Sequence, residues 1–193
     1  SGAYYAVANG SEASSQGLES EFNWAVSEVL TFFGGYTYID ASLTEDLYLH
    51  DASDLTDGKS ELRATNGAQL PGTAKNTINI GAKYEMNLDN GLLLISRIDG
   101  YYQSDVENSI LNIDPDWATT LDGFDLWFMS MTLVGADWTA SLVAKNLFNE
   151  RGTVATYKEE YMTSDVANGF YGTGQKDFIT QPRTISLSAS YRF

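Results

Sequence analysis

The segment that decides the fold is "TISLSASYRF", Thr184 to Phe193, where apolar and polar residues alternate without interruption. Successive side chains of a β-strand point to opposite faces of the sheet. One face of such a strand carries Ile185, Leu187, Ala189, Tyr191 and Phe193. The other face carries a threonine, three serines and Arg192. This period of two predicts a strand with one apolar and one polar face rather than an amphipathic helix.

The same alternation recurs along the chain. It predicts strands at 17–26, 31–41, 77–85, 94–102, 124–134 and 138–146, and a truncated first strand over Ala3 to Ala8. Together with the last segment, about eight strands are expected. The sequence therefore predicts an all-β protein.

The connections between these strands alternate in length. Short ones are expected at 27–30, 87–91 and 135–138, and long ones at 9–16, 45–70, 107–123 and 150–177. The short ones contain Gly, Asn and Asp, which tolerate the backbone angles of tight turns. Long loops are uncommon in compact soluble domains, whereas membrane barrels have short turns on one side and long loops on the other. This order favours an antiparallel up-and-down transmembrane β-barrel.

Composition excludes several functions. The 193 residues carry a formal net charge of -15, which argues against nucleic-acid binding. Cysteine is absent and one histidine is present, so we expect no thiolate metal site, no cofactor and no enzyme activity. The opening "SGAYYAVANG" lacks a basic and an apolar region, so we expect a mature chain or an internal fragment without a signal peptide.

Aromatic residues concentrate near the ends of the expected strands. They are Trp24, Tyr36, Tyr38, Tyr84, Tyr101, Tyr102, Trp138 and Tyr191. Amphipathic rings at these places are typical of the girdles at membrane interfaces. Ordinary packing within a sheet is the alternative for each of them.

Charged residues fall on the polar faces of the expected strands. They are Glu19, Glu21, Lys83, Glu85, Arg97, Asp99, Lys145 and Arg192. An Arg or Lys that faced lipid at mid-membrane would cost roughly 2–4 kcal/mol. We therefore expect these side chains to face the lumen and to form a structural network rather than a substrate site.

Two long loops contain candidate functional residues. The loop at 44–61 is rich in acids and contains His50, but its spacing does not match a calcium-binding loop. A solvated or lipopolysaccharide-facing loop is therefore expected there. In the loop at 150–177, Tyr157, Tyr161, Phe170 and Tyr171 are candidates for ligand contact or for packing within the loop.

Several motifs resemble those of TonB-dependent outer-membrane receptors. "KNLFNE" at 145–150 resembles the penultimate-strand motif of that family, and "QPRTISLSASYRF" at 181–193 resembles its last strand. "QGLESEFNW", "GGYTYIDA", "LPGTAKNTINIGAKYE" and "YYQSDVEN" are similar to upstream motifs and occur in the same order. The resemblance covers essentially the whole chain.

This resemblance implies a 22-stranded barrel of the Gram-negative outer membrane that encloses a plug domain. Residues 1–193 would be a single incomplete domain, the C-terminal part of the barrel, without the plug or the TonB-contacting motif. Its extracellular loops would lie near 45–70, 107–123 and 150–177. The implied function is energy-dependent uptake of a scarce nutrient, with iron–siderophore complexes as the commonest substrate class.

The resemblance also implies partners. They are outer-membrane lipid and lipopolysaccharide, the rest of the barrel with its plug, the inner-membrane TonB complex, and the barrel-assembly machinery. The assembly signal would consist of Phe193, Tyr191, Ala189 and Leu187. Phe193 as a simple interfacial anchor is compatible with this role.

Three alternatives remain at this stage. The first is a complete eight-stranded structural or adhesive barrel, since eight strands can close around packed side chains. The second is a receptor for carbohydrate or vitamin B12. The third is a soluble ligand-binding β-barrel.

Overall fold

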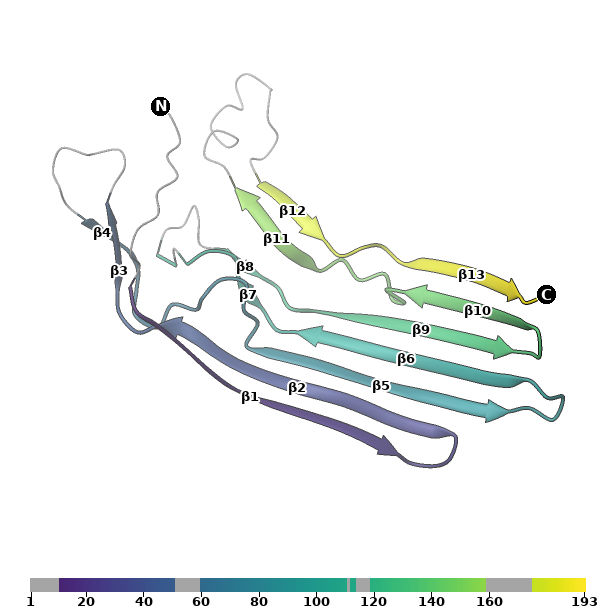
Figure 1. Ribbon diagram of the computed structural model, residues 1–193. Helices are drawn as coiled ribbons and strands as arrows, with labels where there is room; N and C mark the ends of the chain where they lie inside the picture. Colours follow the sequence, from purple (N-terminus) through teal and green to yellow (C-terminus); the bar gives the residue numbers. More distant parts are fainter. Residues whose placement is uncertain (1–10, 51–59, 111, 114–118, 159–174) are drawn as a thin grey trace, which may run out of the picture.

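The computed structural model describes residues 11–50, 60–110, 112–113, 119–158 and 175–193. Seven strands form one antiparallel sheet in the order β1-β2-β5-β6-β9-β10-β13 (Figure 1). Their bounds are β1 Ala13–Ala25, β2 Leu30–Leu43, β5 Asn76–Asn87, β6 Leu93–Gln103, β9 Phe124–Val134, β10 Trp138–Lys145 and β13 Thr184–Tyr191. The up-and-down all-β fold is thus confirmed. The predicted strand at Ala3 to Ala8 lies outside the described residues.

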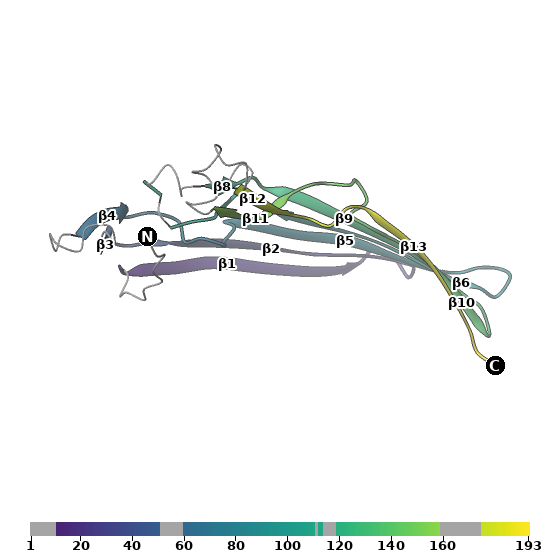
Figure 2. The ribbon, with the colours of Figure 1, turned by 90° about the horizontal axis from the view of Figure 1, so that it is seen from above.

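The sheet is open. Strands β1 and β13 form its two edges, and the sheet curves gently between them without closing (Figures 1 and 2). The described residues therefore do not form a closed barrel. None of these residues belongs to a helix long and apolar enough to cross a membrane.

Three tight turns lie together at one end of the sheet (Figure 1). Between β1 and β2, the N–H of Val26 donates to the carbonyl of Leu30 (2.9 Å), and Ser27 Oγ accepts from the Leu30 N–H (3.2 Å). The turn between β5 and β6 contains Gly91 at φ 78°, a left-handed conformation that favours glycine. The predicted short connections are therefore confirmed, and we call this the turn end.

The long connections gather at the opposite end, the loop end, and three of them contain small hairpins (Figure 1). These pair β3 (Leu47–His50) with β4 (Ser60–Ala64), β7 (Val106–Glu107) with β8 (Thr120–Leu121), and β11 (Thr153–Lys158) with β12 (Gln175–Ile179). The sequence did not predict them, because strands this short show little alternation. The expectation of a connection over 9–16 was wrong for its last part, because β1 begins at Ala13 and pairs there with Leu43 of β2.

The register aligns one predominantly apolar set of residues from all seven strands on one face. One row across the sheet runs from Phe22 through Gly34, Ile80 and Gly100 to Trp127, each residue directly opposite the next. The face continues through Met131 of β9, Leu142 of β10 and Leu187 of β13, which are also opposite one another. Directly opposite residues project to the same side of a sheet. The apolar face is therefore continuous from edge to edge.

This apolar face is largely exposed. Leu187 is 80% exposed, Leu18 64% and Trp24 62%. The buried apolar cluster lies instead at the loop end, where Leu43, Leu47, Ala64 and Ala68 pack with Leu70 and Ile110. Exposed apolar patches of this extent indicate a surface that meets lipid or another apolar partner.

Aromatic rings cover glycines on the neighbouring strand. Phe33 lies directly opposite Gly81, and Trp127 lies directly opposite Gly100. A Cβ on Gly81 would overlap the Phe33 ring and come within 2.9 Å of the Ile98 carbonyl oxygen. The ring therefore occupies the space that a side chain would need, as in the aromatic cover of glycines in designed sheets.

We predict that Gly81→Ala destabilises the folded sheet by about 1–3 kcal/mol, because the added methyl displaces Phe33 or separates two paired strands. Gly35→Ala is the matched control, since its Cβ would meet no atom closer than 3.3 Å. Urea unfolding in lipid vesicles, followed by tryptophan fluorescence, measures both. Equal stability of the two variants would contradict the proposed role of the ring.

Candidate functional site

The polar face contains two ion pairs, each formed along one strand. Arg97 donates to Asp99 through Nε (2.8 Å) and Nη2 (2.6 Å), and its guanidinium lies 4.5 Å from the centre of the Phe33 ring. Lys83 Nζ lies 2.9 Å from Glu85 Oε1. Lys83 and Arg97 lie directly opposite each other. The carboxylate paired with each of them on its own strand balances the two neighbouring positive charges. These side chains are 31–48% exposed, and pairs at such exposure contribute little stability.

The other predicted lumen residues are more dispersed. Glu19 and Glu21 share the polar face on edge strand β1, opposite Thr37 and Gly35. Lys145 ends β10 opposite Thr184. Arg192 lies just beyond β13, where its N–H donates to the carbonyl of Asp137 (2.8 Å). The structure thus brings together four of the eight residues as a compact cluster, and their orientation toward a lumen stays a prediction.

Most aromatic residues of the apolar face form two bands, and Phe22 lies in the same row as Trp127. The band at the turn end comprises Trp24, Phe32, Tyr84, Trp138 and Tyr191, and the band toward the loop end comprises Tyr36, Tyr38, Tyr102 and Trp127. On β5, Tyr84 is six residues from Ile78, which lies opposite Tyr36 and Tyr102. Six strand residues span about 20 Å, the same order as the ~25 Å apolar band of outer-membrane barrels.

Two aromatic residues differ from the prediction. Tyr101 lies opposite Asn79 on the polar face and donates to Gln103 Oε1 (2.9 Å), so its expected place among the interfacial rings was wrong. Phe148, which the sequence did not single out, is 67% exposed. Its ring contacts that of Trp127 edge to face, with the ring centres 6.3 Å apart. The "LF" of the motif therefore supplies a ring next to the loop-side band.

The "NLFN" segment anchors the chain between β10 and β11. Asn146 and Asn149 both have left-handed backbones (φ 49° and 58°), which asparagine tolerates better than most residues. Buried Asn146 donates to the carbonyls of Glu150 (2.8 Å) and Gln181 (2.6 Å) and accepts from the Glu150 N–H (2.8 Å). The motif thereby fastens the start of the last loop to the segment that leads into β13.

Asparagine side chains also join the long loops to one another. Asn108 donates to the carbonyl of Thr156 (2.8 Å) and accepts from its N–H (3.0 Å), as a strand neighbour would. Asn112 accepts from the Thr65 N–H (3.2 Å) and donates to Thr65 Oγ1 (3.1 Å). The connection between β6 and β9 is therefore bonded to the loops on both of its sides.

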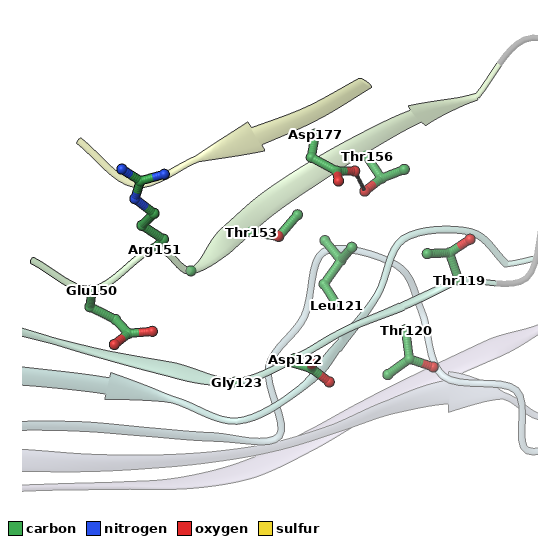
Figure 3. A pocket seen from close by; sticks show the side chains of 11 residues that line it. Thr119, Thr120, Leu121, Asp122, Gly123, Glu150, Arg151, Thr153, Thr156 and Asp177 are labelled. Carbon is green, nitrogen blue, oxygen red and sulfur yellow. Dashed lines mark hydrogen bonds between the residues drawn. The ribbon is translucent and has the colours of Figure 1, made fainter. Parts of the chain in front are cut away.

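A polar pocket lies between two of these joined loops, with a volume of about 360 Å³. We call it the loop-end pocket. It is lined by residues 119–123, by residues 150–153, and by Thr156 and Asp177 (Figure 3). Thr156 Oγ1 donates to Asp177 Oδ1 (2.7 Å), which pairs β11 with β12 at the wall of the pocket.

The predicted loop residues are only partly visible. Tyr157 lies on β11 and is 42% exposed, outside the lining of the loop-end pocket, while Tyr161, Phe170 and Tyr171 lie outside the described residues. Of the acidic loop at 44–61, residues 51–59 lie outside them too. Over the ranges that the structure describes, no group of three or more His, Cys, Asp or Glu side chains is placed to hold a metal ion.

Sequence reasoning missed Asn108, Asn112 and the pocket lining. Each of these depends on contacts between segments far apart in the chain, such as the 48 residues between Asn108 and Thr156. A polar side chain in a loop carries no periodic signal, so a single sequence offers little with which to find them.

The fold and its two faces define a β-barrel membrane protein, and comparison with known proteins identifies its family. The sequence matches the model of the family described as "TonB dependent receptor-like, beta-barrel" over residues 1–193. The chain therefore belongs to the TonB-dependent receptor family, as part of its β-barrel. Members of this family lie in the outer membrane of Gram-negative bacteria, which assigns the chain to that membrane. Among curated proteins no match is found.

Solved structures agree with this fold. The siderophore receptor PiuA from Acinetobacter baumannii has 17% identity and a TM-score of 0.65, covering 93% of this chain and 22% of that one. The ferric yersiniabactin uptake receptor FyuA from Yersinia pestis has 15% identity and a TM-score of 0.67, covering 94% and 24%. The ferric-catecholate import receptor Fiu from E. coli K12 has 17% identity and a TM-score of 0.59, covering 94% and 21%. The chain thus spans less than a quarter of each structure, and at these identities the likeness concerns the fold alone.

We predict that Asn146→Ala destabilises the protein by about 2 kcal/mol or more, because it removes three hydrogen bonds to partly buried backbone groups and strains the left-handed backbone. Asn146→Gly loses the same hydrogen bonds but accepts the backbone angle, so it should cost about 1 kcal/mol less than alanine. Urea midpoints in lipid vesicles compare the two. An alanine variant as stable as the parent, or more stable than the glycine variant, would refute the anchoring role.

Proposed function

We propose that the protein acts in TonB-dependent uptake of a scarce nutrient across the outer membrane, with an iron–siderophore complex as substrate and this chain as the C-terminal part of the barrel. The observation that carries the proposal is the sheet itself. One face is predominantly apolar from β1 to β13, and the opposite face carries the Arg97–Asp99 and Lys83–Glu85 pairs. In a barrel wall the first face meets lipid and the second meets the lumen.

The open edges support a larger barrel. Strand β1 pairs with β2 on one side, and β13 pairs with β10 on one side, so each has a row of backbone groups without a ladder partner among the described residues. Such groups cost several kcal/mol each in hydrocarbon, and spanning sheets therefore close. We propose that further barrel strands pair with both edges. This arrangement is unlike the complete eight-stranded barrel, in which the first and last strands would meet.

The loop end is proposed to face the cell exterior, and the turn end the periplasm. The long connections and the short turns lie at opposite ends of the sheet, as in outer-membrane barrels (Figure 1). In this arrangement the polar face adjoins the plug domain. The exposed rings of Tyr191 and Phe193, whose centres are 5.2 Å apart, lie at the C-terminal end of β13 and would be recognised by the barrel-assembly machinery. The siderophore class rests on the named substrates of the similar structures, and carbohydrate or vitamin B12 remains the alternative.

Paired substitutions test which face meets lipid. Leu142 lies on the apolar face of β10, and Val143 lies on its polar face between Ser130 and Ser186. We predict that Leu142→Arg costs roughly 2–4 kcal/mol in lipid vesicles, because it places a charge in the bilayer, whereas Val143→Arg costs less than about 1 kcal/mol. Unfolding in urea measures both. A larger cost for Val143→Arg would reverse the assigned faces.

Transport measurements test the substrate and the energy source. Cells that express the protein should take up ⁵⁵Fe bound to a catecholate or hydroxamate siderophore, and uptake should fall to background when the gene or TonB is deleted. Labelled maltohexaose and vitamin B12 are the control substrates. Uptake that persists without TonB would refute the proposed mechanism, and accumulation of a control substrate in place of iron would refute the siderophore class.

A further inference from the structure

A second pocket lies at the loop end, on the polar face of the sheet. Its volume is about 390 Å³, and we call it the polar-face pocket. Thr77 of β5 and Gln103 of β6, which lie directly opposite each other, form its floor together with Tyr101. Val106 of β7 and Val154 of β11 form the wall that the long loops contribute. A ligand held there would contact the sheet and two loops at once.

The groups around this pocket are fixed by contacts within the protein. Tyr101 donates to Gln103 Oε1 (2.9 Å), and its ring contacts the ring of Phe124, with the ring centres 6.4 Å apart. The lining segment 72–74 is held too, because its first N–H donates to the carbonyl of Glu107 (3.0 Å). A pocket that is formed before a ligand arrives has a smaller ordering cost on binding.

The lining of the polar-face pocket is uncharged. The chain has 26 acidic residues and 11 lysines and arginines, yet none of the described residues that line this pocket is one of them. The lining combines aliphatic side chains, among them Ile39, Val106 and Val154, with the hydroxyl groups of two threonines and Tyr101 and the amide of Gln103. Pockets of this size, with apolar side chains and a few polar groups, are typical of small-molecule sites.

Gln103 supplies the hydrogen-bond donors of the pocket. Its Oε1 accepts from Tyr101, and no described residue accepts from its amide nitrogen, so two N–H groups remain for a ligand. The carbonyl oxygen of an amide or hydroxamate accepts from such groups without carrying a full charge. The pocket is therefore suited to an uncharged carbonyl next to an apolar surface.

The surroundings of the pocket do not favour an anion. The charged residues that adjoin the lining in sequence are Asp40, Lys75, Asp105 and Glu107, three acids and one cation. Further along the same face, Arg97 is already bonded to its own carboxylate partner. Removing an anion from water costs a large free energy unless a cation or several donors replace the water. An anionic ligand would find no excess of positive charge here.

We propose that the polar-face pocket binds an uncharged, amide-bearing portion of the transported ligand, and thereby selects neutral ferric hydroxamate complexes over anionic ferric catecholate complexes. Iron(III) saturated with hydroxamates is neutral, whereas iron(III) saturated with catecholates is an anion, because each catecholate carries a double negative charge. Ligand carbonyl oxygens accept from Gln103, and ligand aliphatic groups contact Val106 and Val154. The inference rests on the proposed function insofar as the pocket serves a transported ligand.

Two ferric complexes of similar size test this selectivity. Ferrichrome is a neutral hydroxamate complex with a peptide ring, and ferric enterobactin is an anionic catecholate complex. The protein is extracted from outer membranes in detergent and immobilised, and retention of each ⁵⁵Fe-labelled complex gives its affinity. We expect ferrichrome to bind at least about tenfold more tightly than ferric enterobactin.

Matched variants locate the binding. Val154→Trp places a large ring in the pocket from a side chain that is 50% exposed, and should weaken ferrichrome binding about tenfold or more. Tyr48→Trp is the control, because Tyr48 is 54% exposed on another loop-end hairpin and lies outside the lining, so the affinity should change less than about twofold. The mobility of unheated samples in electrophoresis checks that both variants are folded.

A third variant tests the amide donors without filling the pocket. Gln103→Glu keeps an acceptor for the Tyr101 hydroxyl but replaces the N–H donors with a carboxylate oxygen. Ferrichrome binding should weaken about tenfold, because a carbonyl oxygen then faces an acceptor instead of a donor. Unchanged affinity of this variant would contradict the assigned role of Gln103.

The outcomes separate this inference from the proposed function. Absence of ferrichrome binding, equal or tighter binding of ferric enterobactin, or equal effects of Val154→Trp and Tyr48→Trp would each overturn the inference. TonB-dependent uptake of a catecholate complex would then still support the proposed function. Selective ferrichrome binding that Val154→Trp abolishes, without TonB-dependent uptake, would support the pocket and reject the transport proposal.

Discussion

The structure depends on one constraint, the pairing of backbone N–H and C=O groups that water cannot reach in a bilayer. A sheet satisfies these groups only between neighbouring strands, and only closure satisfies them at the edges. The seven strands lie in the sheet in chain order, and each is hydrogen-bonded to its neighbours. Tight turns or long loops connect each strand to the next. This constraint accounts for an extensive hydrogen-bonded ladder in which few of the described apolar residues are buried.

Because backbone pairing holds the strands together, the two faces of the sheet can carry different kinds of side chain. The apolar side chains of one face form an aliphatic band between two aromatic bands, suited to a bilayer and its interfaces. The other face pairs its charges locally, as Arg97 does with Asp99 and the Phe33 ring. A wall of this kind is stable only in the right surroundings, with lipid on one side and water or polar protein on the other.

The loop end is built by different means. There the small cluster around Leu43 and Ala64, together with side-chain bonds from Asn108, Asn112 and Asn146, joins segments that the sheet does not hold. These hydrogen bonds pair backbone N–H and C=O groups that the sheet leaves unpaired. The loops are therefore bonded to one another as one layer. The loop-end pocket is a consequence of this joining, since its walls belong to two loops.

The sequence by itself determined the strands of the sheet, their up-and-down order and the division into turn end and loop end. The physical reason is that a half-lipid, half-water wall imposes a period of two on each strand, and this period can be read locally, as in Thr184 to Tyr191. The pairing register between strands could not be read from a local sequence pattern. Only the tertiary structure set Phe33 over Gly81 and extended β1 back to Ala13. It alone decided the hairpins, the asparagine links and the pocket, because these arise where residues distant in the chain meet, and such meetings leave no periodic trace in the sequence.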